Sequence, residues 1–194
     1  MPDDAIPDNA AARRAMVLSQ LRPQGVTNAA VLAAMGELAR EQYLPEKFAA
    51  LAYGDRPLRL EDGAPVLAPA ELGQLLSQLA PTPGQHALVI GRGGDYSAAV
   101  LRHIGLAVDQ AQRLEDVLTG SFDLILIEGA VEHVPASLAR RLAPGGRIAS
   151  AIVEDGVTRL ATGRGDGKSI GFTSFAEAQV PLLAGLAKAP AFTF

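Results

Sequence analysis

The sequence predicts an α/β fold in which helices precede a shortened, mostly parallel sheet that ends in an antiparallel hairpin. Residues 1–80 show helical spacing of apolar side chains. From His86 onward, short apolar runs alternate with glycine turns and amphipathic helices, which is typical of parallel βαβ units. β-prone residues then flank a glycine-rich stretch at 163–167. The chain of 194 residues is 48% apolar and 20% charged, which indicates a globular protein and favours one domain over residues 1–194.

The part at residues 1–80 is expected to be helical. Two segments carry apolar residues at i, i+3 and i+4, the pattern of an amphipathic helix. Proline is tolerated in the first turn of a helix, where its missing N–H is not needed. The expected elements are helices over residues 12–21 and 31–38, a cap for the second from Thr27 or Asn28, a short helical turn opening at Pro45, and a helix over residues 69–79.

The part at residues 81–194 is expected to be α/β. We predict parallel strands at residues 87–90, 106–109, 122–127 and 147–153, helices at 96–104 and 135–142, and a C-terminal hairpin of strands at 156–162 and 170–180. Only twelve residues separate Asp109 from Phe122. A helix, a strand and a second helix would need roughly 35 to 45 residues there. One α/β unit is therefore absent from the parallel part of the sheet.

A glycine-rich turn, Gly91-Arg92-Gly93-Gly94, directly follows the first of these strands and precedes a helix. In an open parallel sheet this is where nucleotide-like ligands bind, because glycines allow close approach to the backbone and the helix N-terminus offers free N–H groups. Gly91, Gly93 and Gly94 are candidate ligand contacts. Asp109, expected at the end of the second strand, is a candidate for ribose hydroxyl groups. The alternative is that the glycines only turn a strand into a helix.

Composition argues against several classes of partner and site. A net charge of −4 without a dense basic run argues against nucleic acid, and the absence of cysteine excludes disulfides and thiolate sites. No apolar run approaches the roughly 20 residues that span a bilayer. The first residues are acidic and proline-rich, unlike a secretory signal, so a cytoplasmic location is expected.

Three further groups of residues carry side chains of the kinds that form binding sites. His86, His103 and His133 have no metal-binding spacing, and no metal is expected. Residues 162–169 look like a phosphate loop but begin with Thr162 where glycine is required, so a hairpin turn is expected. Glu128, Glu132 and Asp155 follow parallel strands and are either site residues or a solvated rim.

Several co-linear segments carry a family resemblance. They are residues 20–26 (Gln-Leu-Arg-Pro-Gln-Gly-Val), 31–35, 43–45, 52–58, the turn at 91–96, and residues 122–127, 134–135 and 142–147. In their order and spacing the sequence resembles the protein-L-isoaspartate O-methyltransferase family over most of its length. The resemblance implies a Rossmann-like S-adenosylmethionine-dependent methyltransferase fold. It also implies methyl transfer to a protein or peptide carboxylate, with S-adenosylmethionine held by Gly91, Gly93, Gly94 and Asp109.

The sequence departs from the family where the chemistry is done. The family loop Gly-Gln-Thr-Ile-Ser-Gln-Pro is replaced by Gly-Ala-Pro-Val-Leu-Ala-Pro at residues 63–69, so Pro65, Leu67 and Ala68 stand where threonine, serine and glutamine are found. Val89 replaces an acidic residue before the turn, and Asp95 replaces its third glycine. No catalytic residue is therefore assigned, and S-adenosylmethionine binding is doubtful.

Two functional hypotheses follow. In the first, the chain is a weak or inactive carboxyl methyltransferase; in the second, it is a non-enzymatic binding or scaffold protein that retains the fold. The first predicts an open, polar cleft over residues 91–94. The second predicts that Val66, Leu67 or neighbouring side chains fill that cleft. The acceptor and the oligomeric state are left open.

Overall fold

The structure is a computed structural model that describes residues 9–117, 119–165 and 168–183. Residues 1–8, on which the predicted cytoplasmic location rests, lie outside these ranges. Within the described ranges no helix is both long enough and apolar enough to cross a membrane.

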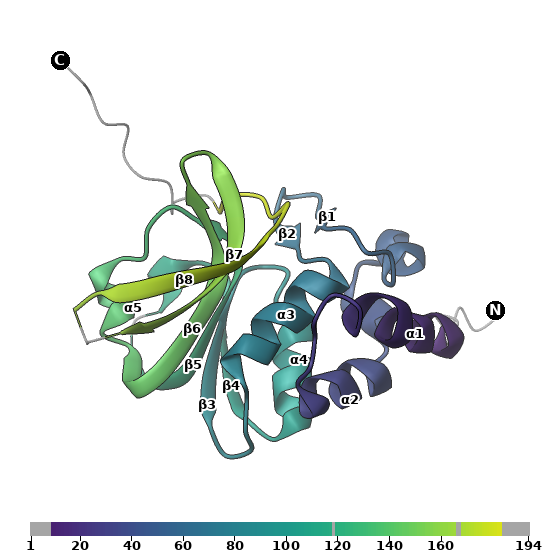
Figure 1. Ribbon diagram of the computed structural model, residues 1–194, viewed down its shortest axis with the longest axis horizontal. Helices are drawn as coiled ribbons and strands as arrows, with labels where there is room; N and C mark the ends of the chain where they lie inside the picture. Colours follow the sequence, from purple (N-terminus) through teal and green to yellow (C-terminus); the bar gives the residue numbers. More distant parts are fainter. Residues whose placement is uncertain (1–8, 118, 166–167, 184–194) are drawn as a thin grey trace.

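A twisted six-stranded sheet forms the centre of the molecule, in the order β4-β3-β5-β6-β7-β8 (Figure 1). The first four strands in this order run parallel, and β6, β7 and β8 form an antiparallel meander. The predicted mostly parallel sheet with an antiparallel C-terminal hairpin is therefore confirmed. The strands are β3 (His86–Ile90), β4 (Ala107–Ala111), β5 (Phe122–Val131), β6 (Leu142–Glu154), β7 (Val157–Gly165) and β8 (Ile170–Glu177).

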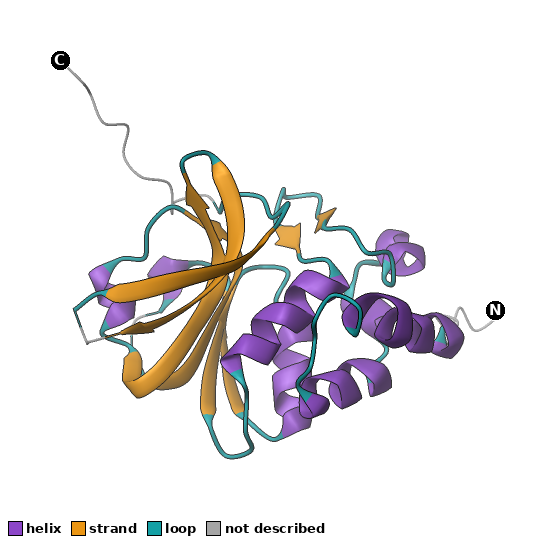
Figure 2. Cartoon of the chain, viewed as in Figure 1, coloured by secondary structure: helices purple, strands orange, loops and turns teal. Residues whose placement is uncertain are grey.

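Alternation along the central strands buries both faces of the sheet. In β3, Ala87 and Val89 belong to the apolar cluster on one face, whereas Leu88 and Ile90 belong to the cluster on the other. The first cluster packs against four helices gathered on one side of the sheet, and the second includes Leu138 of a short helix on the opposite side (Figure 2). The helices are α1 (Ala10–Met16), α2 (Ala29–Glu37), α3 (Pro69–Leu79) and α4 (Asp95–Ile104), with α5 (Ala136–Ala139) opposite.

The N-terminal helices form where the apolar spacing and the caps predict them. α1 continues into a turn of π-helix at Val17–Leu21. Asn28, one of the two predicted caps, accepts a hydrogen bond from the Val31 N–H at 3.1 Å. The turn predicted at Pro45 is a 3-10 helix, Glu46–Leu51, and a second 3-10 helix spans Arg40–Tyr43. The predicted bounds of α3 are confirmed at both ends.

The C-terminal part differs in detail from the prediction. The helix expected at 135–142 is limited to α5, because β6 begins five residues earlier than predicted and Leu142 pairs with Phe122. Asp155 and Gly156 form the two-residue turn between β6 and β7, with φ of 50° and 76°. Positive φ at both positions is the requirement of a type I′ hairpin turn, so Asp155 is a turn residue.

The segment that looks like a phosphate loop is part of the β7–β8 hairpin. Residues 162–165 lie within β7, and β8 begins at Ile170. A phosphate loop leads from a strand into a helix, whereas here both flanking elements are antiparallel strands. Residues 166 and 167, between them, lie outside the described ranges.

The predicted shortening of the sheet is confirmed in the described part of the chain. β4 is an edge strand that pairs only with β3 in the named sheet. After β4, a 3-10 turn at Leu114–Asp116 leads back toward β5 without another strand among the described residues. The side of the sheet beyond β4 is consequently open.

Candidate functional site

The glycine turn lies between β3 and α4, at the carboxyl end of the parallel strands. Gly91 adopts φ 138°, a conformation that side chains disfavour. Its N–H donates to the Ala111 carbonyl at 2.9 Å, and the Gly94 N–H donates to the Gly91 carbonyl at 3.2 Å. The turn is thus fixed by its own backbone and by the end of β4.

All three glycines are needed for close packing. A β-carbon at Gly93 would lie 2.4 Å from the Pro65 carbonyl oxygen and 3.0 Å from the Cγ2 atom of Val66. One at Gly94 would lie 2.7 Å from the Cγ1 atom of Val89, and one at Gly91 would lie 3.0 Å from the Cβ atom of Glu128. In the direction in which a side chain would point, the space beside these glycines is therefore filled by the protein itself.

The segment that covers the turn is residues 65–68. It begins with β2 (Pro65–Val66), which forms a small hairpin with β1 (Leu58–Arg59). Val66 and Leu67 are buried, as is Ala68. Leu67 joins the main core, and Val66 packs in a satellite cluster with Leu58. Apolar groups therefore occupy the loop position where the family carries hydroxyl and amide groups.

Asp109 is not brought to the glycine turn. β4 ends at Ala111, two residues beyond the predicted end, and Asp109 pairs in register with Leu88 in the middle of β3. The Oδ2 atom of Asp109 is paired with the Nε2 atom of His86 at 3.2 Å, at the opposite end of β3 from the turn. The residue at the strand end beside Gly91 is Ala111, which offers no carboxylate.

Asp95 opens α4 and is bound to the neighbouring strand. Its Oδ1 atom accepts a hydrogen bond from the Nε2 amide group of Gln110 at 3.0 Å. The Oε1 atom of Gln110 in turn accepts a hydrogen bond from the Arg102 guanidinium at 3.0 Å. A carboxylate in the first turn stabilises the helix dipole. In this position Asp95 also places a negative charge at the helix N-terminus where a ligand carboxylate would be bound.

Glu128 is a buried acid directly behind the glycine turn. It is 1% exposed, and its Oε1 atom accepts a hydrogen bond from the Ser97 hydroxyl of α4. Burial raises its pKa to about 8; the Arg40 charge opposes this shift and the Asp95 charge adds to it. The solvated-rim interpretation is wrong for Glu128, because β5 runs four residues past its predicted end and encloses it.

Arg40 holds the covering segment in place, and nothing in the sequence pattern singled it out. It is 2% exposed, and its Nη2 atom donates to the Leu67 carbonyl at 2.6 Å. Its guanidinium carbon lies 4.8 Å from the centre of the Tyr96 ring. The Nε atom of Arg40 and the Oε2 atom of Glu128 are buried without a hydrogen-bond partner in the described part of the chain.

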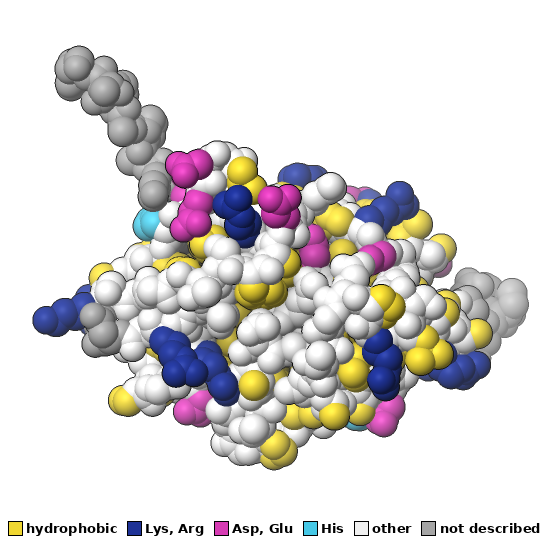
Figure 3. Space-filling view, in the orientation of Figure 1, with side chains coloured by type: hydrophobic (Ala, Val, Ile, Leu, Met, Phe, Trp, Pro, Cys, Tyr) yellow, Lys and Arg dark blue, Asp and Glu magenta, His cyan; other side chains and the backbone are white. Residues whose placement is uncertain are grey.

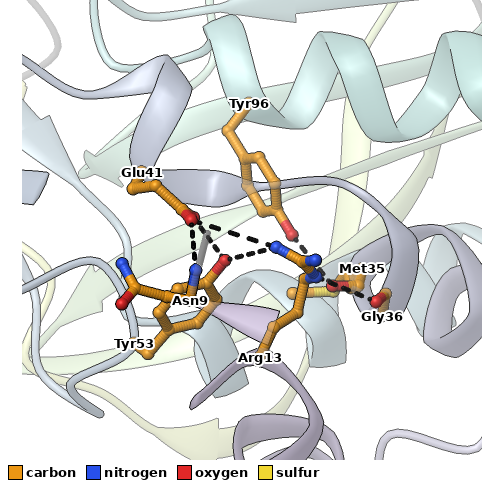
Figure 4. Close-up of polar contacts among 7 residues, drawn as sticks. All are labelled: Asn9, Arg13, Met35, Gly36, Glu41, Tyr53 and Tyr96. Atoms are coloured by element: carbon orange, nitrogen blue, oxygen red, sulfur yellow. Dashed lines mark hydrogen bonds and ion pairs between the residues drawn. The ribbon is translucent and has the colours of Figure 1, made fainter. Parts of the chain in front are cut away.

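The next residue, Glu41, anchors the same 3-10 helix to α1 (Figure 4). Its carboxylate accepts hydrogen bonds from the Tyr53 hydroxyl and from the Asn9 N–H, and it faces Arg13 at 3.9 Å. Although burial alone would raise the pKa of Glu41, these hydrogen bonds and the Arg13 charge lower it overall. Arg13 also donates to the Gly36 carbonyl at 3.1 Å. Because Glu41 directly follows Arg40 in the chain, these contacts also hold the backbone of Arg40 in position.

The histidines lie apart from the turn. His86 binds Asp109, and His103 of α4 binds Glu37 at 3.0 Å. Over the ranges 9–117, 119–165 and 168–183, no group of three or more potential ligands is arranged to hold a metal ion.

Comparison of the sequence with known proteins shows to which family the chain belongs. A family model described as Protein-L-isoaspartate(D-aspartate) O-methyltransferase matches residues 12–115. Protein-L-isoaspartate O-methyltransferase of Methylorubrum populi is 34% identical over 92% of this chain and 98% of its own length. The chain belongs to the protein-L-isoaspartate O-methyltransferase family. A relative of the same name from Methylorubrum extorquens is 32% identical over 96% of the chain and 94% of its own length.

Solved structures of the family share the fold. The structure of a Plasmodium falciparum homologue in complex with S-adenosyl-L-homocysteine has a TM-score of 0.70 at 18% identity, covering 88% of this chain and 97% of its own. A second protein-L-isoaspartate O-methyltransferase structure has a TM-score of 0.72 at 18% identity, covering 90% of this chain and 67% of its own. The Rossmann-like methyltransferase fold predicted from the sequence is confirmed.

Proposed function

We propose that this family member is a binding protein that transfers methyl groups slowly or not at all. The observation that carries the proposal is the packing of Pro65 and Val66 against Gly93, which fills the side of the turn to which a side chain at this position would point. A donor held in the usual manner of a glycine turn needs the backbone at this place to be accessible. Here the covering segment would have to move first.

The acceptor side of the site supports the same proposal. Methyl transfer from a sulfonium to an ionised carboxylate needs little acid or base help, so catalysis depends on positioning. Pro65, Leu67 and Ala68 provide no side-chain donor, and the Leu67 carbonyl is already bound by Arg40. Loss of one positioning hydrogen bond in a transition state typically costs about 10²- to 10³-fold in rate.

The residues present also fit S-adenosylmethionine poorly. Asp109 is engaged by His86, and Ala111 stands at the strand end where a carboxylate could reach a ribose. Asp95 repels the carboxylate of a bound amino acid group. We therefore expect a dissociation constant above about 1 mM, or binding weaker than roughly −4 kcal/mol.

The second candidate is an active carboxyl methyltransferase acting on isoaspartyl proteins, as the family name states. The identity of 34% over 92% of the chain favours it. In that case Gly91, Gly93 and Gly94 contact the donor after the covering segment has opened, and a protein or peptide carboxylate is the acceptor. A cytoplasmic location suits either candidate.

Calorimetric titration with S-adenosylmethionine and S-adenosylhomocysteine, together with a radiolabel assay on an isoaspartyl peptide, separates the two candidates. We expect no binding below about 1 mM and no methylated peptide above background. The M. populi relative, assayed in parallel, is the positive control. Binding in the micromolar range with methyl transfer would overturn the proposal.

A further inference from the structure

A groove of about 350 Å³ opens over the carboxyl ends of β3 and β4, beside the covered glycine turn. Its volume lies at the lower end of the range found for small-molecule sites. Three arginines line it, Arg59, Arg92 and Arg113, together with the apolar side chains of Ile90, Leu114 and Leu182.

The groove is positively charged, although the whole chain carries a net charge of −4. Asp62 is the single acidic residue on its described lining, so three arginines face one carboxylate. Asp62 is paired with the Nε atom of Arg92 at 2.8 Å, and Arg59 makes a long 3.4 Å contact to the Gly63 carbonyl. The backbone N–H of Arg113 donates to the Oδ2 atom of Asp116 at 3.0 Å, and Asp116 itself does not line the groove. The lining therefore carries about two uncompensated positive charges.

The charge is local. On the face shown in Figure 3, lysine and arginine side chains lie in several separate groups and not in one continuous basic surface. A long polyanion such as nucleic acid requires an extended row of cations. A groove of this size, with three arginines on its lining, suits a small anion instead.

The apolar part of the groove is preformed. Leu182 is 42% exposed and lines the groove together with Ile90 and Leu114. Its segment is fixed on β5: the Ala130 N–H donates to the Pro181 carbonyl and the Leu183 N–H donates to the Ala130 carbonyl, both at 2.8 Å. A planar apolar group can therefore lie between Leu182 and the buried end of β3 without ordering the segment.

We propose that this groove binds a small organic phosphate, a molecule that carries a phosphate monoester on a planar apolar body. Arginine binds phosphate oxygens with two parallel hydrogen bonds, and two net positive charges match a phosphate dianion. The same charges repel a sulfonium, because Asp62 is the single carboxylate on this described lining that could attract its positive charge. An anionic ligand over these strand ends presupposes the non-catalytic binding role proposed above.

Isothermal titration with adenosine monophosphate at low salt tests the groove, with inorganic phosphate, adenosine and S-adenosylmethionine as separate titrants. We expect adenosine monophosphate to bind with a dissociation constant below about 1 mM and at least about tenfold more tightly than the other three. Raising the salt to about 0.5 M weakens the binding, because the attraction is electrostatic. Equal binding of inorganic phosphate would mean an adventitious ion only, and absence of adenosine monophosphate binding would overturn the assignment.

Single substitutions locate the binding. Arg92→Gln and Arg113→Gln each weaken binding of adenosine monophosphate about tenfold, the usual loss for a hydrogen bond to a charged group. Arg22→Gln, at an exposed arginine that does not line the groove, is the matched control and leaves binding unchanged. Circular dichroism confirms that each variant folds. Equal affinity of all three variants would overturn the proposal.

The peptide methylation assay separates failure of the groove from failure of the proposed function. Methyl transfer would overturn the non-catalytic role and, with it, the anionic ligand. No methyl transfer together with no adenosine monophosphate binding would overturn the groove alone.

Discussion

At the scale of single residues, Glu128 is a buried carboxyl group directly behind the glycine turn. It lies inside an apolar strand with Ser97 as its hydrogen-bond partner, and its second oxygen has no partner in the described part of the chain. A carboxyl group buried in this way keeps its proton, because desolvation penalises the charged form. The folded chain therefore carries a neutral acid behind the glycine turn at neutral pH.

Replacing Glu128 by glutamine should stabilise the protein at high pH. The folded carboxyl loses its proton near pH 8, whereas in the unfolded chain it does so near its ordinary pKa of 4.5. Unfolding between these values releases a proton, so the contribution of Glu128 to stability is full below about pH 4.5 and falls as pH rises to about 8. Glu128→Gln keeps a partner for Ser97 and removes this loss, raising the free energy of unfolding by about 1–3 kcal/mol at pH 8.

Urea denaturation at pH 5 and pH 8 measures this effect. The exposed Glu154→Gln variant is the control and should follow the wild-type pH dependence. If Glu128→Gln lowers stability equally at both pH values, the buried carboxyl is ionised and paired in the native state.

Gly93 tests the covering segment directly. Gly93→Ala should destabilise the fold by about 1–3 kcal/mol, because its β-carbon would collide with the Pro65 carbonyl in a packed region. Gly171→Ala is the matched control, since a β-carbon there meets no atom within 4 Å. Thermal denaturation compares the two variants. An unchanged melting temperature for Gly93→Ala would show that the segment lifts from the turn at little cost and that the donor site is accessible.

The residues of the site were only partly predictable from the sequence. The glycines were identified because a strand, a turn and a helix succeed one another locally. Arg40 was missed because its burial depends on contacts with Leu67 and Tyr96, distant in the chain. Asp109 was placed by its distance from Gly91, but a shift of two residues at the end of β4 moved its carboxylate to His86.

At the scale of elements, prediction succeeded where a local pattern determines the structure. The bounds of α3 follow from Pro69 at its first turn and from the apolar spacing up to Leu79. Prediction failed for α5, which has four residues, because pairing of β6 with β5 replaced helical turns. Such pairing is a tertiary effect that single-segment propensity does not contain.

The N-terminus of α3 offers a further test at this scale. Ala68 occupies the cap position, where the Glu71 carboxylate accepts the Ala68 N–H at 3.2 Å but no side chain returns a bond to the helix. Ala68→Ser adds that acceptor and completes a capping box, so we expect the free energy of unfolding to rise by about 0.5–1 kcal/mol. Chemical denaturation measures it, with Ala68→Val as the control that adds volume without a hydroxyl. Equal destabilisation by both variants would mean that packing at this buried position outweighs capping.

At the scale of the whole molecule, the shortened sheet sets an uneven distribution of stability. β5 lies between β3 and β6 and is buried along nearly its full length, whereas β4 pairs on one side only and exposes three of its five residues. The α/β unit whose absence was inferred from twelve residues between Asp109 and Phe122 would extend the chain beyond this edge. Its absence leaves the groove next to β4, which is the least enclosed strand of the parallel part.

Hydrogen exchange should reveal this gradient. Amides of β5 exchange only through global unfolding, because both neighbouring strands must separate first, whereas amides of β4 open locally. We expect exchange in β4 to be at least about tenfold faster, corresponding to roughly 1.4 kcal/mol, as measured by mass spectrometry at pH 7. Adenosine monophosphate at saturation should slow exchange at the end of β4 and leave β5 unchanged, because residues 112–114, directly after β4, line the groove and no residue of β5 does. Protection of β4 equal to that of β5 in the free protein would mean that its outer edge is covered, and that the sheet is not open beside the groove.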